Sequence, residues 1–233
     1  YNMEDVKCWP DGTGYALAEF LRSRGHTPEF IDPVWRQEAE KLAKSLIEKE
    51  KSFGLIYDFL YREYGRRKRP ADAENIRKLK VSNNPKELQY TLELAGHYYI
   101  LNRPDERDRI IQSVLATPRR LSTPNVRRTV GDFYRQLREY EKALAAYRKG
   151  IEAGEGEKVE FQRRIAEILA TQGKRAEASR MIEVILKEHP KDSATEALKS
   201  TLKLESGDPS QIKASVGELE AVLTRMPQNA VVR

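Results

Sequence analysis

The chain repeats itself, because three of its segments can be aligned with one another at a nearly constant offset. In each segment a branched apolar residue is followed by a small residue and, three positions later, by a large one. The segments are Leu94-Ala95-x-x-Tyr98, Val130-Gly131-x-x-Tyr134 and Ile165-Ala166-x-x-Leu169, which lie 36 and 35 residues apart. A period in this range predicts a solenoid of stacked helical hairpins, in which each unit buries its apolar stripe against its neighbours.

The composition agrees with a solenoid. Of the 233 residues, 39% are hydrophobic and 33% are charged, and the mean hydropathy of −0.71 is low for a compact globule of this size. A solenoid tolerates such a composition because each unit buries only the stripes that face its neighbours.

The charges are abundant but nearly balanced, with 42 basic and 36 acidic residues and a net charge of +6. Basic and acidic residues alternate, as in residues 103–109, which is typical of solvated helix faces with ion pairs one turn apart. A surface that binds a polyelectrolyte more often separates the two signs. We therefore do not expect nucleic acid as the partner, although the pI of about 9.2 keeps RNA as an alternative.

Several site classes are not expected from this sequence. Cys8 is the only cysteine, so neither a disulfide framework nor a multi-cysteine metal site can form within the chain. No apolar run approaches the ~20 residues that span a bilayer, and no signal peptide is visible. We expect no cofactor, no metal and no membrane span.

Within a repeat, small residues predict a close approach of two helices. In residues 124–157, apolar residues at helical spacing mark a first helix, and a second follows the turn at 138–140. Gly131 and Ala143 are expected to let these helices approach closely, with Tyr134 and Tyr147 filling the space beside them.

The repeats set the expected domain organisation. Five tandem units are predicted at residues 54–87, 88–121, 124–157, 159–192 and 194–227. Residues 1–53 are expected to form a divergent helical repeat or an N-terminal cap, with helices near 15–25 and 35–49. Residues 228–233 are expected to begin a further helix. Because solenoids usually end in a polar capping helix, we expect the chain to be a fragment of a longer array.

The repeats resemble the tetratricopeptide repeat. The matching residues are Val130, Gly131, Tyr134, Ala143 and Tyr147 in one unit and Ile165, Ala166, Leu169, Ala178 and Pro190 in the next. The resemblance covers residues 54–227 and implies an all-α, right-handed superhelix of stacked antiparallel helix pairs. It also implies that the first helices line a concave groove that binds peptides or protein surfaces. The family members that bind acidic chaperone tails need Lys and Asn where this chain has Asp58, Arg62 and Glu93, so that role is not expected.

The same resemblance implies a set of groove-facing side chains. They are Asp58, Arg62, Arg66, Tyr99, Arg128, Asp132, Arg135, Glu160, Arg163 and Glu167. Arg128 and Arg135 lie two turns apart on one helix face, and Arg163 is the equivalent of Arg128 in the next unit. These guanidiniums could converge on a carboxylate of a partner. The alternative, which we favour, is that they pair with Asp132, Glu160 and Glu167, since such exposed pairs are common and contribute only ~0–1 kcal/mol each.

Two other motifs have local explanations. The basic run at residues 66–69 could contact phosphate or an acidic partner, but it follows a helix C-terminus, where cations interact favourably with the helix dipole. His97-Tyr98-Tyr99 is expected to be structural, because Tyr98 occupies a core position of the repeat.

We therefore expect a non-catalytic protein–protein interaction module that binds a peptide or protein surface in its concave groove. One alternative is an RNA-binding helical-repeat protein. Another is the substrate-docking arm of an enzyme whose catalytic domain lies outside these residues. The unfinished repeat at the C-terminus also predicts that such chains associate end to end.

Overall fold

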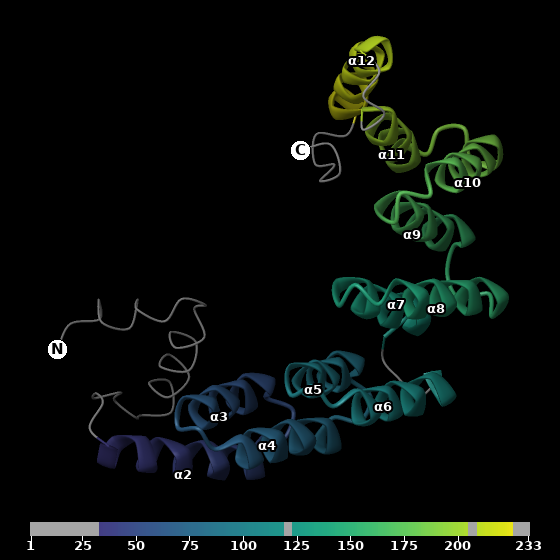
Figure 1. Cartoon of the computed structure of the whole chain (residues 1–233). Helices are drawn as coiled ribbons and strands as arrows, with labels where there is room; N and C mark the ends of the chain where they lie inside the picture. The colour runs from purple at the N-terminus through teal and green to yellow at the C-terminus, as the bar shows by residue number, and fades with distance from the viewer. Residues whose placement is uncertain (1–32, 119–122, 205–208, 226–233) are drawn as a thin grey trace. The chain divides into compact units, whose positions relative to one another are not determined.

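The computed structural model describes residues 33–118, 123–204 and 209–225, and all the regular structure in these ranges is helical. The helices are labelled α2 to α12 (Figure 1). The chain divides into two compact units, residues 1–123 and residues 124–233. The prediction of an all-α fold is therefore confirmed for the described residues. The helix predicted near residues 15–25 and the start of a helix at 228–233 lie outside them.

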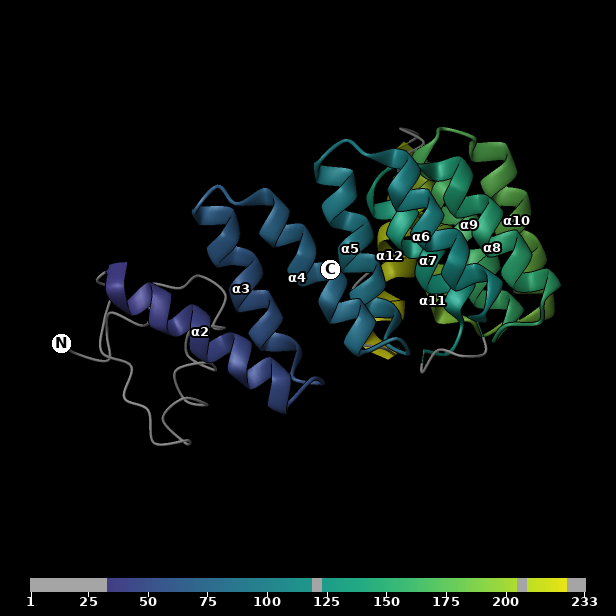
Figure 2. The ribbon, with the colours of Figure 1, turned by 90° about the horizontal axis from the view of Figure 1, so that it is seen from below.

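In the first unit, the described residues 33–118 form two helical hairpins and one preceding helix. Its helices are α2 (Pro33–Lys49), α3 (Gly54–Arg66), α4 (Pro70–Asn83), α5 (Leu88–Ile100) and α6 (Pro104–Ala116). Helix α3 pairs with α4 and α5 pairs with α6, while α2 packs on α3 and α4 packs on α5. Figure 2 shows α2 to α5 in succession, each beside the next.

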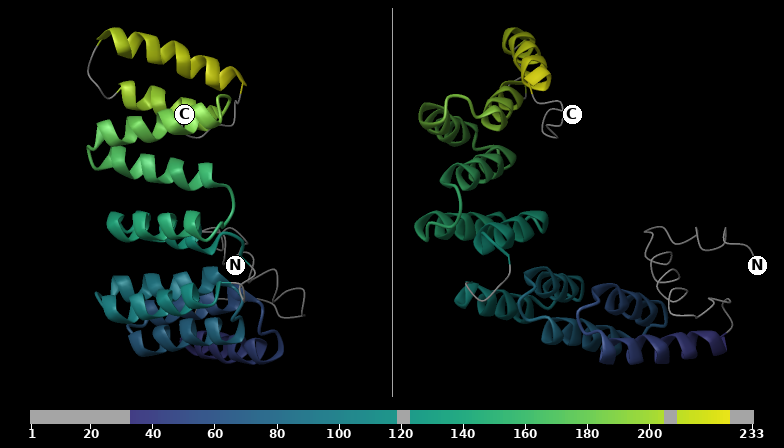
Figure 3. Two further views of the ribbon diagram at one scale, coloured as in Figure 1. Left: turned by 90° about the vertical axis from the view of Figure 1, so that its right-hand side faces the viewer. Right: turned by 180° about the vertical axis from the view of Figure 1, so that it is seen from behind.

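In the second unit, the described residues form three hairpins. Its helices are α7 (Val126–Gln136), α8 (Tyr140–Glu152), α9 (Lys158–Thr171), α10 (Arg175–Glu188), α11 (Ser193–Leu204) and α12 (Pro209–Arg225). The pairs are α7 with α8, α9 with α10 and α11 with α12, and the stack continues through contacts of α8 with α9 and of α10 with α11. Figure 3 shows the green-to-yellow helices of this unit stacked in this order. Each unit is therefore a short solenoid of antiparallel helix pairs.

Four hairpin turns have the same backbone conformation. The residues Lys68, Asn102, Arg138 and Gly173 have positive φ values of 55°, 53°, 59° and 76°. The residue after each of them donates its backbone N–H to a carbonyl of the preceding helix, as from Arg69 to Tyr64 at 2.9 Å. This is the Schellman ending, which satisfies carbonyls that the helix leaves without partners. Pro70 and Pro104 then begin α4 and α6, at the first helical position, where proline is favoured.

Small residues set the distance between α7 and α8, as predicted. Ala143 and Tyr147 are fully buried, and a Cβ atom added to Gly131 would overlap the Tyr147 ring. The absence of a side chain at Gly131 therefore makes room for the tyrosine of the second helix.

We expect Gly131→Ala to lower the free energy of unfolding by about 1–3 kcal/mol, because the added methyl group must displace a fully buried ring. Gly217→Ala in α12 is the matched control, since a Cβ atom there meets no other atom within 4 Å. This control should be neutral or stabilising by up to about 1 kcal/mol, from helix propensity alone. Urea denaturation of both variants checks the prediction, and equal stability of the two would contradict it.

Helix α4 buries a charged residue where an apolar one is usual. Lys80 is 1% exposed, whereas Leu79 is 41% exposed and Ile76 is buried. The apolar residues of this helix therefore do not follow the periodicity of the other repeats. The reason is that a lysine occupies one of the inward positions.

Candidate partner-binding surface

The residues predicted to face a groove fall into two groups, one in each unit. Arg62 and Arg66 lie on α3 and Tyr99 lies on α5 of the first unit. In the second unit, Arg128, Asp132 and Arg135 lie on α7, and Arg163 lies on α9.

Each of the three arginines in the second unit is held by a different carboxylate. The Arg128 guanidinium contacts Glu160 of the neighbouring helix. Arg135 lies 3.4 Å from Glu167, also on α9. Arg163 lies 3.1 Å from Asp192, the residue that precedes α11. The pairs of Arg128 and Arg135 are those expected in the ion-pair alternative, and the three guanidiniums point to three separate acids.

Asp132 joins its own hairpin to the next one. It accepts a hydrogen bond of 2.6 Å from the Tyr147 hydroxyl, and the Arg164 Nε atom lies 3.4 Å from the same carboxylate oxygen. Burial and the hydrogen bond to Asp132 raise the pKa of Tyr147. Tyr147 therefore remains a neutral donor at physiological pH, and Asp132 serves as its acceptor.

A depression of about 280 Å³ borders this row of charges. It lies between the α7–α8 turn and α9, and the Arg135–Glu167 pair forms part of its wall. Its lining residues are Arg135, Gln136, Arg138, Tyr140, Glu167, Ile168 and Thr171. The α7–α9 face, defined here by Arg128, Asp132, Arg135 and Arg163 together with this depression, is the part of the predicted groove that the structure brings together.

In the first unit, Asp58 belongs to an internal ion network. Its carboxylate lies 2.6 Å from Arg77 and 2.8 Å from Lys80, and the same two cations lie 2.6 and 2.7 Å from Glu93. The Lys80 ammonium also lies 4.1 Å from the centre of the Tyr90 ring. This network joins α3, α4 and α5 and explains how Lys80 can be buried.

The other candidates of the first unit have different surroundings. Arg66 is exposed and pairs with Glu63, one turn earlier. Arg62 is half-buried, and burial together with the nearby cations Arg66 and Arg77 lowers its pKa. Tyr99, the one aromatic residue among the candidates, has a side chain that is 45% exposed.

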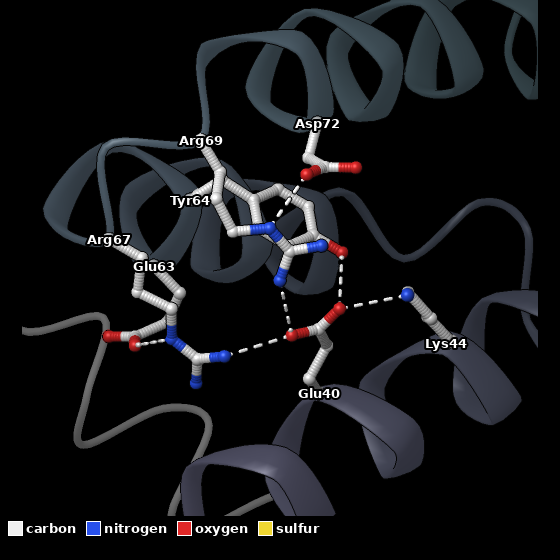
Figure 4. A network of polar contacts seen from close by, with 7 residues as sticks. All are labelled: Glu40, Lys44, Glu63, Tyr64, Arg67, Arg69 and Asp72. Carbon is white, nitrogen blue, oxygen red and sulfur yellow. Dashed lines mark hydrogen bonds and ion pairs between the residues drawn. The ribbon is translucent and has the colours of Figure 1, made fainter. Parts of the chain in front are cut away.

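The basic run at residues 66–69 is held by acids of the same unit. Glu40 of α2 accepts hydrogen bonds from Lys44, Tyr64, Arg67 and Arg69 at 2.8, 3.1, 3.0 and 3.1 Å (Figure 4). Burial alone would raise the pKa of Glu40, but the hydrogen bonds from Lys44 and Tyr64 lower it. Arg69 also donates to Asp72 at 2.7 Å. The run follows the C-terminus of α3, as the sequence predicts, whereas the pairing of Arg67 and Arg69 with these acids was not predicted.

The same cluster recurs 34 residues later and was not predicted. The Glu40 cluster consists of Glu40, Lys44, Tyr64, Arg69 and Asp72, and the Glu74 cluster of Glu74, Lys78, Tyr98, Arg103 and Glu106. The central Glu of the second cluster accepts bonds from its Lys, Tyr and Arg at 2.7, 3.1 and 2.6 Å. Each arginine also stacks on the tyrosine of its cluster, at 4.7 and 4.8 Å. The constant offset of five polar residues was the sequence signal that could have revealed both clusters.

The equivalent positions of the second unit carry exchanged charges. Tyr134 is followed by Glu139 and Lys142 where Tyr64 is followed by Arg69 and Asp72. Glu139 and Lys142 pair at 2.9 Å, and the lysine ammonium lies 5.4 Å from the centre of the Tyr134 ring. Both arrangements place a cation over the tyrosine ring. In the first unit the cation is the arginine five positions after the tyrosine, and here it is the lysine eight positions after it.

His97 is buried, which agrees with the structural role expected for His97-Tyr98-Tyr99. It is 5% exposed, and its Nδ1 atom lies 3.1 Å from the Tyr61 hydroxyl. Burial lowers the pKa of this imidazole, so the neutral form is favoured near pH 7.

The Glu74 cluster predicts a stability change in acid. Hydrogen bonds from Lys78 and then from Arg103 and Tyr98 outweigh burial and lower the pKa of Glu74 from 4.5 to about 2. A carboxyl whose pKa is lower in the folded state stabilises the fold fully above about pH 4.5, and this contribution is lost as the pH falls toward 2.

We therefore expect Glu74→Gln to destabilise the chain at pH 7 by roughly 1.5–3 kcal/mol, the range for hydrogen bonds to a charged group. The difference from wild type should shrink between pH 4.5 and 2. Urea denaturation across this range measures it. Glu48→Gln, at an exposed position on α2, should stay within about 0.5 kcal/mol of wild type. If the stability difference between Glu74→Gln and wild type did not change with pH, Glu74 would not be the carboxyl whose lowered pKa stabilises the fold.

Among the described residues, no helix is long and apolar enough to cross a membrane. The same residues contain no group of three or more His, Cys, Asp or Glu side chains that could hold a metal ion.

No protein-family model matches the chain, and no curated protein matches it. Solved structures do resemble it, and they include tetratricopeptide repeat proteins. PilW, a type IV pilus biogenesis factor, is 14% identical, with 95% of this chain and 97% of PilW covered and a TM-score of 0.49. A tetratricopeptide repeat protein from Parabacteroides merdae is 14% identical, with 99% and 85% covered and a TM-score of 0.49. YrrB, a tetratricopeptide protein with an unusual peptide-binding site, is 12% identical, with 82% and 95% covered and a TM-score of 0.41.

Proposed function

We propose that the chain is a non-catalytic interaction module that binds a peptide or a protein surface through the first helix of each hairpin. The α7–α9 face is the central part of this proposal, with Arg62, Arg66 and Tyr99 as the corresponding side chains of the first unit. The observation that carries the proposal is the row of charged side chains on α7 and α9 beside the depression of about 280 Å³.

Arg135 is the residue of this face that can most readily bind a partner. Its 3.4 Å contact with Glu167 is longer than the 2.7–2.9 Å typical of a charge-assisted hydrogen bond, and its side chain is 35% exposed. Because an exposed ion pair contributes only ~0–1 kcal/mol, a carboxylate of a partner can replace Glu167 at small cost.

The surrounding acids favour a protein partner over RNA. Glu160, Glu167 and Asp132 lie among the arginines of this face. A phosphate backbone would meet these carboxylates together with the cations, whereas nucleic-acid binding depends on cations that neutralise successive phosphates. A protein surface with charges of both signs fits the alternation better.

A photo-crosslinking amino acid placed at Gln136 tests the proposal, because this exposed side chain lines the depression. In the cells that produce the chain, we expect a small number of discrete protein adducts. The same substitution at Thr224, exposed on α12, is the control and should not give them. Combining Arg135→Gln with the crosslinker at position 136 should lower the yield of these adducts several-fold.

Three outcomes would count against the proposal. They are the absence of any adduct at Gln136, identical adducts at the control position, and adducts that disappear on nuclease treatment. The last outcome would favour the RNA-binding alternative.

A further inference from the structure

A second surface of the second unit contains an apolar groove that the predicted site does not include. Helices α8 and α10 both pack against α9, and because each is antiparallel to α9, they run parallel to one another. The hollow between them has a volume of about 460 Å³. We call it the α8–α10 groove, and its apolar lining residues are Ile151, Ile165, Leu169, Met181 and Val184.

The apolar side chains of this groove exceed what hairpin packing requires. Ile165 and Leu169 form the floor and are buried, whereas Val184 is 45% exposed. At an offset of 35 residues, the counterpart of Val184 in α8 is Lys149, which is exposed to solvent. The position therefore accepts a charged residue in one hairpin and carries an exposed valine in the next. Ile151 and Met181 beside it are half-buried, so apolar side chains of both helices reach the surface of the groove.

A buried polar group in the groove lacks a partner. Gln162 lines the groove and is 7% exposed, yet within the described part of the chain its Oε1 atom accepts no hydrogen bond. Buried side-chain acceptors are nearly always satisfied in native proteins. A donor from a bound segment would satisfy this one.

The charges at the edge of the groove indicate the nature of that segment. Arg148 and Arg180 both border the hollow and are exposed. Neither forms an ion pair with any residue that the structure describes, and Arg180 donates only to the Ala176 carbonyl, at 3.2 Å. The arginines of the α7–α9 face, in contrast, are each matched by an acid. Two unmatched cations beside an apolar floor fit a segment that is both apolar and acidic.

The remaining charged lining residue gives the groove a direction. Glu177 lies in the first turn of α10, whereas Arg148 lies in the C-terminal half of α8. Since α8 and α10 run parallel, these residues mark opposite ends of the groove. A segment bound there would place acidic side chains near Arg148, whereas at the other end it would meet both Glu177 and Arg180, which lie three positions apart on α10.

We infer that the α8–α10 groove binds an amphipathic helix of a partner protein. This helix carries large apolar side chains at i, i+3 or i+4, and i+7, with acidic side chains that meet Arg148 and Arg180. Its apolar face lies between α8 and α10, as in other complexes in which a helix fills a groove. The groove is distinct from the α7–α9 face, so the two surfaces can be tested separately.

The test is a selection from a phage library of helix-forming peptides with randomised surface positions, using the full chain as the target. We expect enriched peptides with the apolar spacing given above and more acidic than basic residues. Fluorescence anisotropy with labelled peptides should show that Val184→Glu raises the Kd by roughly tenfold or more, the effect of losing a central contact. Arg148→Glu should raise it several-fold through charge repulsion.

Val216→Glu on α12 is the matched control, because Val216 is also 45% exposed. It should leave the Kd unchanged, and all variants should keep the wild-type helical circular dichroism. The inference is overturned if no peptide is enriched, or if Val216→Glu weakens binding as much as Val184→Glu. Peptides that respond to Arg135→Gln but not to Val184→Glu would also overturn it, while supporting the α7–α9 face of the proposed function.

Discussion

A helical hairpin cannot bury its apolar stripe alone, so within each unit successive hairpins depend on the contacts between neighbouring helices. In the first unit, a single carboxylate strengthens such a contact. Glu40 and Glu74 each project from one helix and accept hydrogen bonds from the tyrosine and arginine of the following hairpin turn. The Schellman ending places the arginine directly after the αL residue. Apolar packing and one shared anion thus fix each hairpin against its predecessor.

The helical hairpins could be predicted from the sequence because their signals are local and repeated. Gly131 and Tyr147 illustrate this, since the missing side chain and the ring that fills its place lie at the positions that the repeat pattern predicts. Helix α4 departs from the repeat pattern because Lys80 faces inward there. A buried lysine is compatible with the fold only when its carboxylates are present, and these come from α3 and α5 rather than from the same helix.

The candidate surfaces could be predicted only in part. Family resemblance selected Arg128 and Arg135, and pairing with Glu160 and Glu167 was the favoured alternative. The partner of Arg163 was not foreseen, since Asp192 belongs to the entry of the next hairpin. The α8–α10 groove has no continuous sequence motif, because its lining residues come from three helices. Its defining feature is the exposure of Val184. Exposure and unmatched charge depend on tertiary packing, which periodicity does not report.

The 34-residue offset between the two glutamate clusters has a consequence for how such a chain can grow. Each cluster takes its anion from one helix and its tyrosine and arginine from the next hairpin, so every period carries both halves of the junction. A tandem duplication of residues 70–103 would bring a complete set of junction residues with it. The first unit could therefore be lengthened by whole hairpins without inventing a new interface, which makes gene duplication a simple route to a longer binding surface.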